Sequence, residues 1–160
     1  MFRRFLETQP SGTLFLQRVA LGAVMLPHGA QKLFGWFGGF GFSGTMHFFT
    51  GTMHVPAVLA FLVIVSEALG SIALLLGLGT RLAAFGAAAT MVGAVLTTHA
   101  QFGFFMNWFG TQPGEGFEYH LLALALAIPL VVRGGGAWAL DHAASRALGG
   151  PGTRALATVS

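Results

Sequence analysis

The sequence predicts an all-α membrane protein built as a four-helix transmembrane bundle. Of its 160 residues, 54% are hydrophobic and only 8% are charged. Soluble domains carry about 25% charged residues, so water could not solvate the surface of so apolar a protein. Four segments are also apolar over the roughly 20 residues that cross a hydrocarbon core. The length fits one domain, which we expect over residues 1–148.

The four expected spans can be placed by their apolar composition. They cover residues 13–34, 55–78, 82–105 and 117–132. In the connection after the first span, which is rich in glycine and phenylalanine, we expect a short interfacial helix over residues 44–50. An amphipathic helix is expected within residues 138–148, and residues 149–160 are expected to form a disordered tail.

The arginines predict that both termini are cytoplasmic. They precede the first span, lie between the second and third, and follow the fourth: Arg3, Arg4, Arg81, Arg133, Arg146 and Arg154. Cytoplasmic connections carry an excess of Lys and Arg, whereas the other two connections here contain neither. We therefore expect a multi-pass protein of a bacterial or archaeal inner (plasma) membrane.

The net charge of +3 is scattered along the chain and forms no run that could follow a nucleic acid, so the bilayer is the expected partner. The chain contains no cysteine. This excludes disulfides, thiolate nucleophiles and cysteine ligation of an iron–sulfur cluster by this chain.

Two charged residues fall at membrane depth on the first two spans. At a rise of 1.5 Å per residue, Arg18 and Glu67 lie at levels that differ by only a few ångströms. Because unpaired buried charges are rare, we expect them to form a structural ion pair that holds the two helices together. The alternative is that Glu67 carries a proton or contacts a ligand.

A second polar set is expected near the outer ends of three spans. His28, Gln31 and Lys32 share one face of the first helix, because their spacing is i, i+3 and i+4. The remaining members come from the third and fourth spans: His99, Gln101, Glu118 and His120. Polar residues at this depth are costly and usually serve packing or function, so the set predicts a ligand site or a structural network.

Several chemistries fit this set. Histidine, amide and lysine donors beside an apolar, aromatic pocket fit the headgroup of a quinone or a similar lipophilic molecule. A nitrogen and oxygen metal site from His28, His99, His120 and Glu118 is less well supported, because the spacing is not that of a compact metal motif. Haem bound by two histidines is also a weaker interpretation. The fourth interpretation is a satisfied polar network that holds the bundle together. The other histidines, His47, His54 and His142, are expected in loops or at the interface.

An ordered set of motifs runs through residues 13–142. Its members are Arg18, the run His28–Gly35, Gly44-Thr45, Glu67 with Gly70, the run Gly77–Arg81, His99, Gly103–Phe105, Gly116–Tyr119 and Trp138–Asp141. In these motifs the chain resembles the DoxX family of small membrane proteins.

The resemblance implies a four-helix membrane bundle and an association with redox complexes. Members accompany thiosulfate:quinone oxidoreductases, quinol oxidases, and assemblies with sulfurtransferase or superoxide dismutase. Many members have no assigned activity, so no catalytic mechanism is transferred, and the absence of cysteine argues against direct sulfur transfer by this chain.

The leading hypothesis is a membrane subunit of a quinone-linked redox system. In it His28, His99 and Glu118 hydrogen-bond the headgroup or exchange protons with it, while Gln31 and Lys32 orient it. The alternative is a non-catalytic anchor or assembly subunit, and the third hypothesis is a small transporter or lipid-binding protein. The resemblance implies a redox-protein partner. A homo-oligomer is compatible with four glycines that permit close helix contacts within the bundle or between copies: Gly22, Gly70, Gly86 and Gly93. Whether the chain is itself an enzyme stays open.

Overall fold

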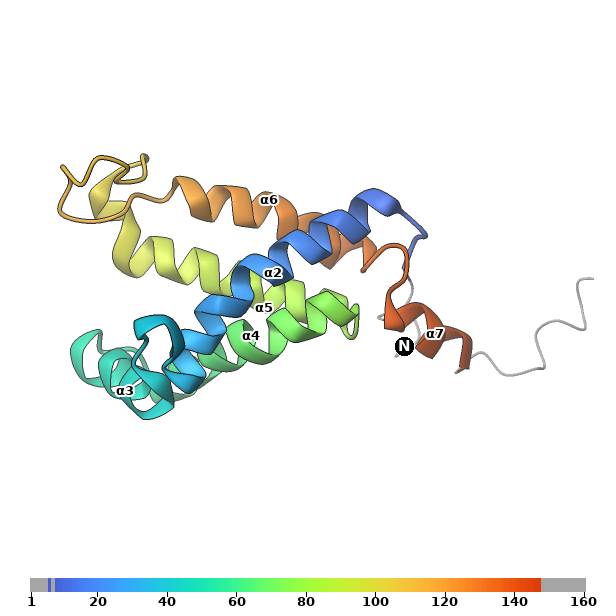
Figure 1. Ribbon diagram of the computed structural model, residues 1–160, viewed down its shortest axis with the longest axis horizontal. Coiled ribbons are helices and arrows are strands. Elements are labelled where there is room, and N and C mark those ends of the chain that lie inside the picture. Colours follow the sequence, from blue (N-terminus) through green and yellow to red (C-terminus); the bar gives the residue numbers. More distant parts are fainter. Residues whose placement is uncertain (1–5, 7, 148–160) are drawn as a thin grey trace, which may run out of the picture.

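The computed structural model describes residue 6 and residues 8–147, and all regular secondary structure in that part of the chain is helical (Figure 1). The four long helices are α2 (Gly12–Phe34), α4 (Ala57–Leu76), α5 (Thr80–Ala94) and α6 (Glu118–Arg133). Helix α5 continues through the turns η3 (Val95–His99) and η4 (Ala100–Phe102). The shorter elements are η1 (Trp36–Gly38), α3 (Gly41–His47), η2 (Phe48–Thr52) and α7 (Leu140–Ala147).

The all-helical prediction is confirmed. The long helices begin and end within three residues of the expected spans when η3 and η4 are counted with α5. The short helix expected at residues 44–50 is α3 followed by η2, and the helix expected within residues 138–148 is α7. The predicted tail, residues 149–160, lies outside the described residues.

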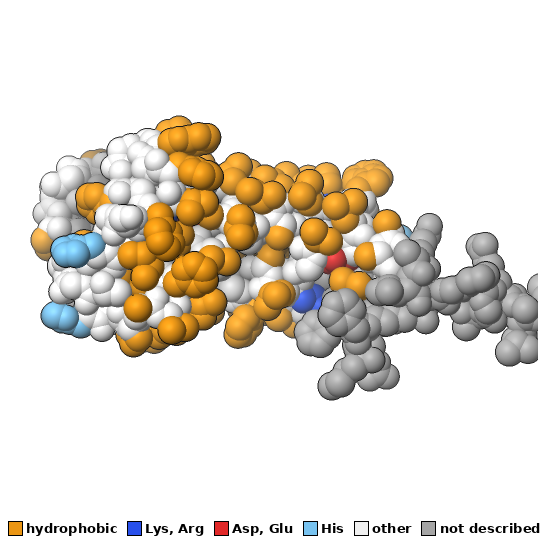
Figure 2. All heavy atoms as spheres, turned by 90° about the horizontal axis from the view of Figure 1, so that it is seen from below, with side chains coloured by type: hydrophobic (Ala, Val, Ile, Leu, Met, Phe, Trp, Pro, Cys, Tyr) orange, Lys and Arg blue, Asp and Glu red, His pale blue; other side chains and the backbone are white. Residues whose placement is uncertain are grey.

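Two helices in the described part of the chain are long and apolar enough to cross a membrane. They cover Ala57–Leu76 and Thr80–Phe102, and a third or less of each is buried inside the protein. Large apolar side chains therefore point outward, and Figure 2 shows hydrophobic side chains spread along the outside of the long helices. The chain thus has the helices of a membrane protein, and a crossing by all four long helices stays a prediction.

The long helices pack as neighbours around one core. Helix α2 lies against α4 and α6, and α5 lies against the same two helices. The core is rich in alanine on α5 and α6, where Ala84 and Ala127 are fully buried. Small residues let helix backbones approach closely, which supplies packing where the hydrophobic effect is weak.

A face of α2 with coiled-coil-like spacing forms the contact with α4. Its members follow steps of four and three residues: Arg18, Gly22, Met25, Gly29 and Lys32. The approach is closest at Gly29, where a Cβ atom would lie 2.5 Å from both the Ala68 Cα and the Glu67 carbonyl oxygen. Because any larger side chain would push the backbones apart, glycine at position 29 sets the distance between α2 and α4.

Glu67 forms its ion pair with Lys32, so the expected Arg18–Glu67 pair is wrong. The Lys32 Nζ lies 2.5 Å from Glu67 Oε2, and the Glu67 side chain is only 5% exposed. Lys32 follows Gly29 by almost one helical turn, so the close approach at Gly29 brings it within reach of α4. Lys32, expected in the polar set near the outer end of the first span, thus turns toward Glu67 on α4.

Arg18 is satisfied by backbone carbonyls. Its guanidinium donates to the carbonyls of Leu74 and Leu75 at 2.7 Å each, and to those of Gly135 at 2.9 Å and Ala137 at 3.3 Å. The first two belong to the last turn of α4, where carbonyls lack helical partners and the helix dipole favours a cation. Arg18 is 1% exposed, so it caps the C-terminus of α4 from within the protein interior.

Asp141 caps the N-terminus of α5. Its carboxylate accepts hydrogen bonds from the Gly79 N–H at 2.6 Å and the Thr80 N–H at 2.9 Å, where α5 begins. Asp141 is 1% exposed and its own N–H donates to the Gly77 carbonyl. Together with Arg18, it fastens the segment after α6 to the connection between α4 and α5.

The close approach at Gly29 predicts a specific sensitivity. We expect Gly29→Ala to lower the free energy of unfolding by about 2 kcal/mol or more, because the new methyl group overlaps the α4 backbone. Gly93→Ala is the matched control, since a Cβ there meets nothing within 4 Å and alanine favours a helix. Denaturant unfolding in detergent micelles measures both. Equal stability of Gly29→Ala and wild type would contradict the close contact.

Double-mutant cycles can show whether Lys32 or Arg18 is the ion-pair partner of Glu67. Lys32→Met and Glu67→Gln should be coupled by at least about 1 kcal/mol, because each removes one partner of a largely buried pair. Arg18→Met and Glu67→Gln should add to within about 0.5 kcal/mol, because the α4 carbonyls that Arg18 binds lie about 10 Å along the helix from Glu67. Strong coupling of Arg18 with Glu67 would restore the pair expected from sequence.

Candidate functional site

Polar groups from three of the long helices and from the turn after α5 come together at one end of the protein. This is the end that carries α3 and the connection over residues 103–117, whereas α7 and the start of α2 lie at the other end (Figure 1). The set, here called the polar site, comprises His28, Lys32, Glu67, His99, Tyr119 and His120. Helices α2, α4 and α6 and the turn after α5 each contribute at least one member.

The buried carboxylate of the polar site belongs to Glu67. Its Oε2 atom accepts from Lys32, and only 5% of its side chain is exposed. Tyr119, on α6, is within electrostatic range of this carboxylate. A buried carboxylate balanced by one cation can accept a hydrogen bond from a bound hydroxyl group.

Two histidines are stacked between α6 and the turn after α5. The ring centroids of His99 and His120 are 4.2 Å apart, with the rings tilted by 42°. The His99 Nδ1 lies 2.8 Å from the Glu115 carbonyl oxygen. Because a carbonyl only accepts, this Nδ1 carries a proton, and in the neutral ring Nε2 is the acceptor. The pair therefore offers a hydrogen-bond acceptor beside a buried imidazole.

Two buried polar atoms of the polar site have no hydrogen-bond partner in the described part of the chain. They are the hydroxyl oxygen of Tyr119 and the Nδ1 of His120, and His120 is only 7% exposed. The Tyr119 ring lies 6.4 Å from that of His28 and 5.7 Å from that of His120, measured between centroids. An unsatisfied buried polar group is costly, and water or a ligand commonly supplies the partner.

Tyr119 was not among the residues singled out for the site from sequence alone. It appeared only within the family motif Gly116–Tyr119. Two signals could have identified it: it is the only tyrosine of the chain, and it lies between two polar residues at the start of a span.

Three residues expected in the site have other partners. The Gln31 Nε2 donates to the Phe37 carbonyl at 3.3 Å, and the Gln101 Nε2 donates to the Thr98 carbonyl at 2.9 Å. The Glu118 Oε2 accepts from the Met106 N–H at 3.3 Å. These side chains order the connections next to the polar site.

The described residues do not form a metal centre. Among residue 6 and residues 8–147, no three His, Cys, Asp or Glu side chains are arranged to hold a metal ion. His28, His99, His120 and Glu118 therefore do not meet as a ligand set, because Glu118 turns toward the 103–117 connection. The polar site carries groups that can form hydrogen bonds and exchange protons with an organic ligand.

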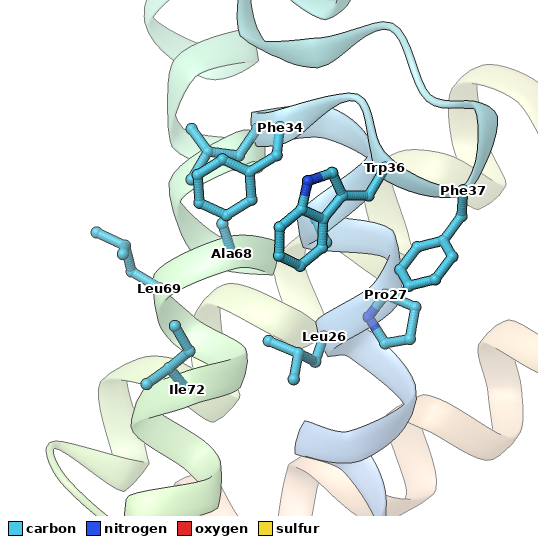
Figure 3. Close-up of a pocket in the computed structure, with 10 residues that line it drawn as sticks. Leu26, Pro27, Phe34, Trp36, Phe37, Ala68, Leu69 and Ile72 are labelled. Atoms are coloured by element: carbon cyan, nitrogen blue, oxygen red, sulfur yellow. The ribbon is translucent and has the colours of Figure 1, made fainter.

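A separate cavity lies between α2 and α4. Its volume is 290 Å³, and its ten lining residues, all nonpolar, include Pro27, Trp36 and Ile72 (Figure 3). None belongs to the polar site. On α2, the lining residues Ala30 and Leu33 lie on one side of Gly29, and His28 lies on the other side. The cavity and the polar site therefore lie on different sides of the contact between α2 and α4.

Comparisons with known proteins agree with the motifs in the sequence. The DoxX family model matches residues 13–100. A protein of Bacillus subtilis (strain 168) named putative oxidoreductase CatD is 31% identical over 130 residues, which are 81% of this chain and 84% of that protein. No solved structure gave a significant match. On the family model and this relative, the chain belongs to the DoxX family.

Proposed function

We propose that this chain is a membrane subunit of a redox system and that its polar site binds the headgroup of a quinone or a similar lipophilic redox molecule. One observation carries the proposal: two buried polar atoms, the Tyr119 hydroxyl and the His120 Nδ1, lack partners among the described residues, in a site built from α2, α4, α6 and the turn after α5. Family membership and a relative named as an oxidoreductase support the redox class.

The donors and acceptors of the polar site match what a quinone headgroup requires. A quinone has two carbonyl oxygens, which accept hydrogen bonds from a phenol, an imidazole N–H or an ammonium group. A quinol has two hydroxyl groups, which donate to a carboxylate or an unprotonated imidazole nitrogen. Tyr119, Lys32 and the histidines supply the first kind of group, and Glu67 and the His99 Nε2 supply the second.

Proton exchange with the bound ring is the role we assign to the acidic and basic groups. Two-electron reduction of a quinone takes up two protons, and oxidation of the quinol releases two. The Glu67 carboxylate and the stacked histidines can hold and return these protons. The electrons belong to a redox-protein partner, with which this chain would form a complex.

We further propose that all four long helices span an inner (plasma) membrane with both termini in the cytoplasm. The arginines that precede α2, begin α5 and follow α6 support this orientation under the positive-inside rule. The polar site then lies toward the outer leaflet, and exposed aromatic residues such as Trp36, Trp108 and Phe109 lie near the outer interface.

Ligand binding is tested by titrating the purified protein with a short-tailed quinone. Tyr119→Phe should weaken binding roughly five- to tenfold, because it removes one hydrogen bond worth about 1 kcal/mol and leaves the ring in place. His54→Ala is the control, since His54 is exposed and lies outside the polar site. Isothermal titration calorimetry reads the affinity directly.

The same titration separates a ligand site from a structural network. Equal affinity in wild type and in a folded His28→Ala/His99→Ala double variant would sink the proposed site. Copurification of a partner protein with no quinone binding would instead support the anchor or assembly subunit.

The orientation can be tested without background labelling, because the natural chain has no cysteine. Thr111→Cys, in the 103–117 connection, should react with a membrane-impermeant maleimide in intact cells. Gln9→Cys, just before α2, should react only after the membrane is permeabilised. The reverse pattern would invert the proposed topology, and labelling of both sites in intact cells would contradict it.

A further inference from the structure

The apolar groove between α2 and α4 has the dimensions of a single hydrocarbon chain. It extends along α2 from Leu26 to Phe34, a distance of roughly 12 Å, which matches about ten methylene groups. Its volume is 290 Å³, and all ten of its lining residues are nonpolar. The length and the apolar lining fit part of one acyl chain.

An aromatic flap closes one end of this groove. Gly35 ends α2 with a φ of 74°, which turns the chain back, and Trp36 and Phe37 then lie over Pro27 (Figure 3). The ring centroid of Trp36 is 5.2 Å from that of Phe34 and 6.4 Å from that of Phe37. The flap thus forms a continuous aromatic wall at the α3 end of the groove.

The flap is held in an uncommon backbone conformation. Phe37 has a φ of 53°, a left-handed value that side chains other than glycine rarely adopt. The Gln31 amide donates to the Phe37 carbonyl at 3.3 Å, and Gly39 packs directly on the Gln31 backbone. Such strain persists only where the surroundings impose it, and it is found at ligand clamps. A side chain expected to bind a headgroup instead holds the flap.

The open side of the groove faces the surface that a bilayer would cover. Its α4 wall contains Leu69 and Ile72, which are 57% and 46% exposed, and α4 is one of the two candidate spans. Trp36, at the closed end, is 60% exposed and is of the type that lies at the membrane interface. None of the lining residues is charged or polar.

We infer that the groove holds one acyl chain of a phospholipid from the leaflet on the α3 side, bound without selection for headgroup charge. This rests on the membrane position of α4 and is independent of quinone binding, because the Gly29 contact separates the groove from the polar site. A quinone with its headgroup among Tyr119 and the histidines would have to cross that contact to place its tail here.

The inference is tested on delipidated full-length protein with Trp36 as its sole tryptophan (Trp108→Phe/Trp138→Phe). Phosphatidylcholine with brominated acyl chains is titrated in, and quenching of Trp36 is recorded. Quenching should saturate near one lipid per protein. Leu69→Phe, which fills the groove, should weaken binding about tenfold. Leu62→Phe, at a 52%-exposed position of α4 outside the groove, should leave it unchanged.

Further titrations identify the molecule that occupies the groove. Brominated phosphatidylglycerol should bind within about threefold of phosphatidylcholine, because no charge lines the groove. Tyr119→Phe should bind lipid like wild type even if it loses quinone. Quenching that never saturates and is equal in all variants, saturation only with a tailed quinone, or a strong preference for the anionic lipid would each overturn the inference. Matching elution and thermal unfolding of Leu69→Phe and wild type establishes that the variant is folded.

Discussion

The close contact between α2 and α4 at Gly29 is the constraint on which the rest of the structure depends. With no side chain at that position, the two backbones approach until a Cβ atom would lie 2.5 Å from the Ala68 Cα. The approach brings Lys32 to the carboxylate of Glu67, so a charge on a largely apolar helix acquires a partner. The same contact separates two environments, a polar one toward α6 and an apolar groove toward the lipid. A single glycine therefore sets the boundary between the proposed quinone site and the proposed acyl-chain groove.

The far end of the protein is organised by the same physical need, which is to pair polar groups where water is scarce. Arg18 binds the free carbonyls at the end of α4, and Asp141 binds the free N–H groups at the start of α5. Arg81 caps the end of α6 in the same way, because its guanidinium donates to the carbonyls of Val131 and Val132. Motifs that are scattered along the sequence thus serve a common purpose, since they close the helix ends and fasten the segment after α6 to the bundle. At the α3 end, by contrast, the buried Tyr119 hydroxyl and the His120 Nδ1 face other members of the polar site without a hydrogen-bond partner in the described part of the chain.

Much of the fold could be predicted from sequence, because helix positions depend on local composition and length. The partner of Arg18 could not, because depth along a helix does not report rotation about its axis, and Gly135 lies 117 residues away in the chain. Lys32 turns inward for a reason visible only in three dimensions, the approach at Gly29. For the polar site, convergence of His28, His99 and His120 follows from topology and was expected. The turn of Glu118 toward its own connection and the unpartnered hydroxyl of Tyr119 depend on side-chain directions that no spacing rule supplies.

Quinone binding at the polar site is the central claim, and the redox assignment of this DoxX-family chain depends on it. The most direct test is to purify the protein from its native membrane in mild detergent, extract the bound lipophilic molecules and quantify them by mass spectrometry. The account predicts an isoprenoid quinone at close to one per protein in wild type and a marked loss from Tyr119→Phe, with phospholipid content unchanged. A quinone content no higher than that of an unrelated membrane protein purified from the same membranes would contradict it.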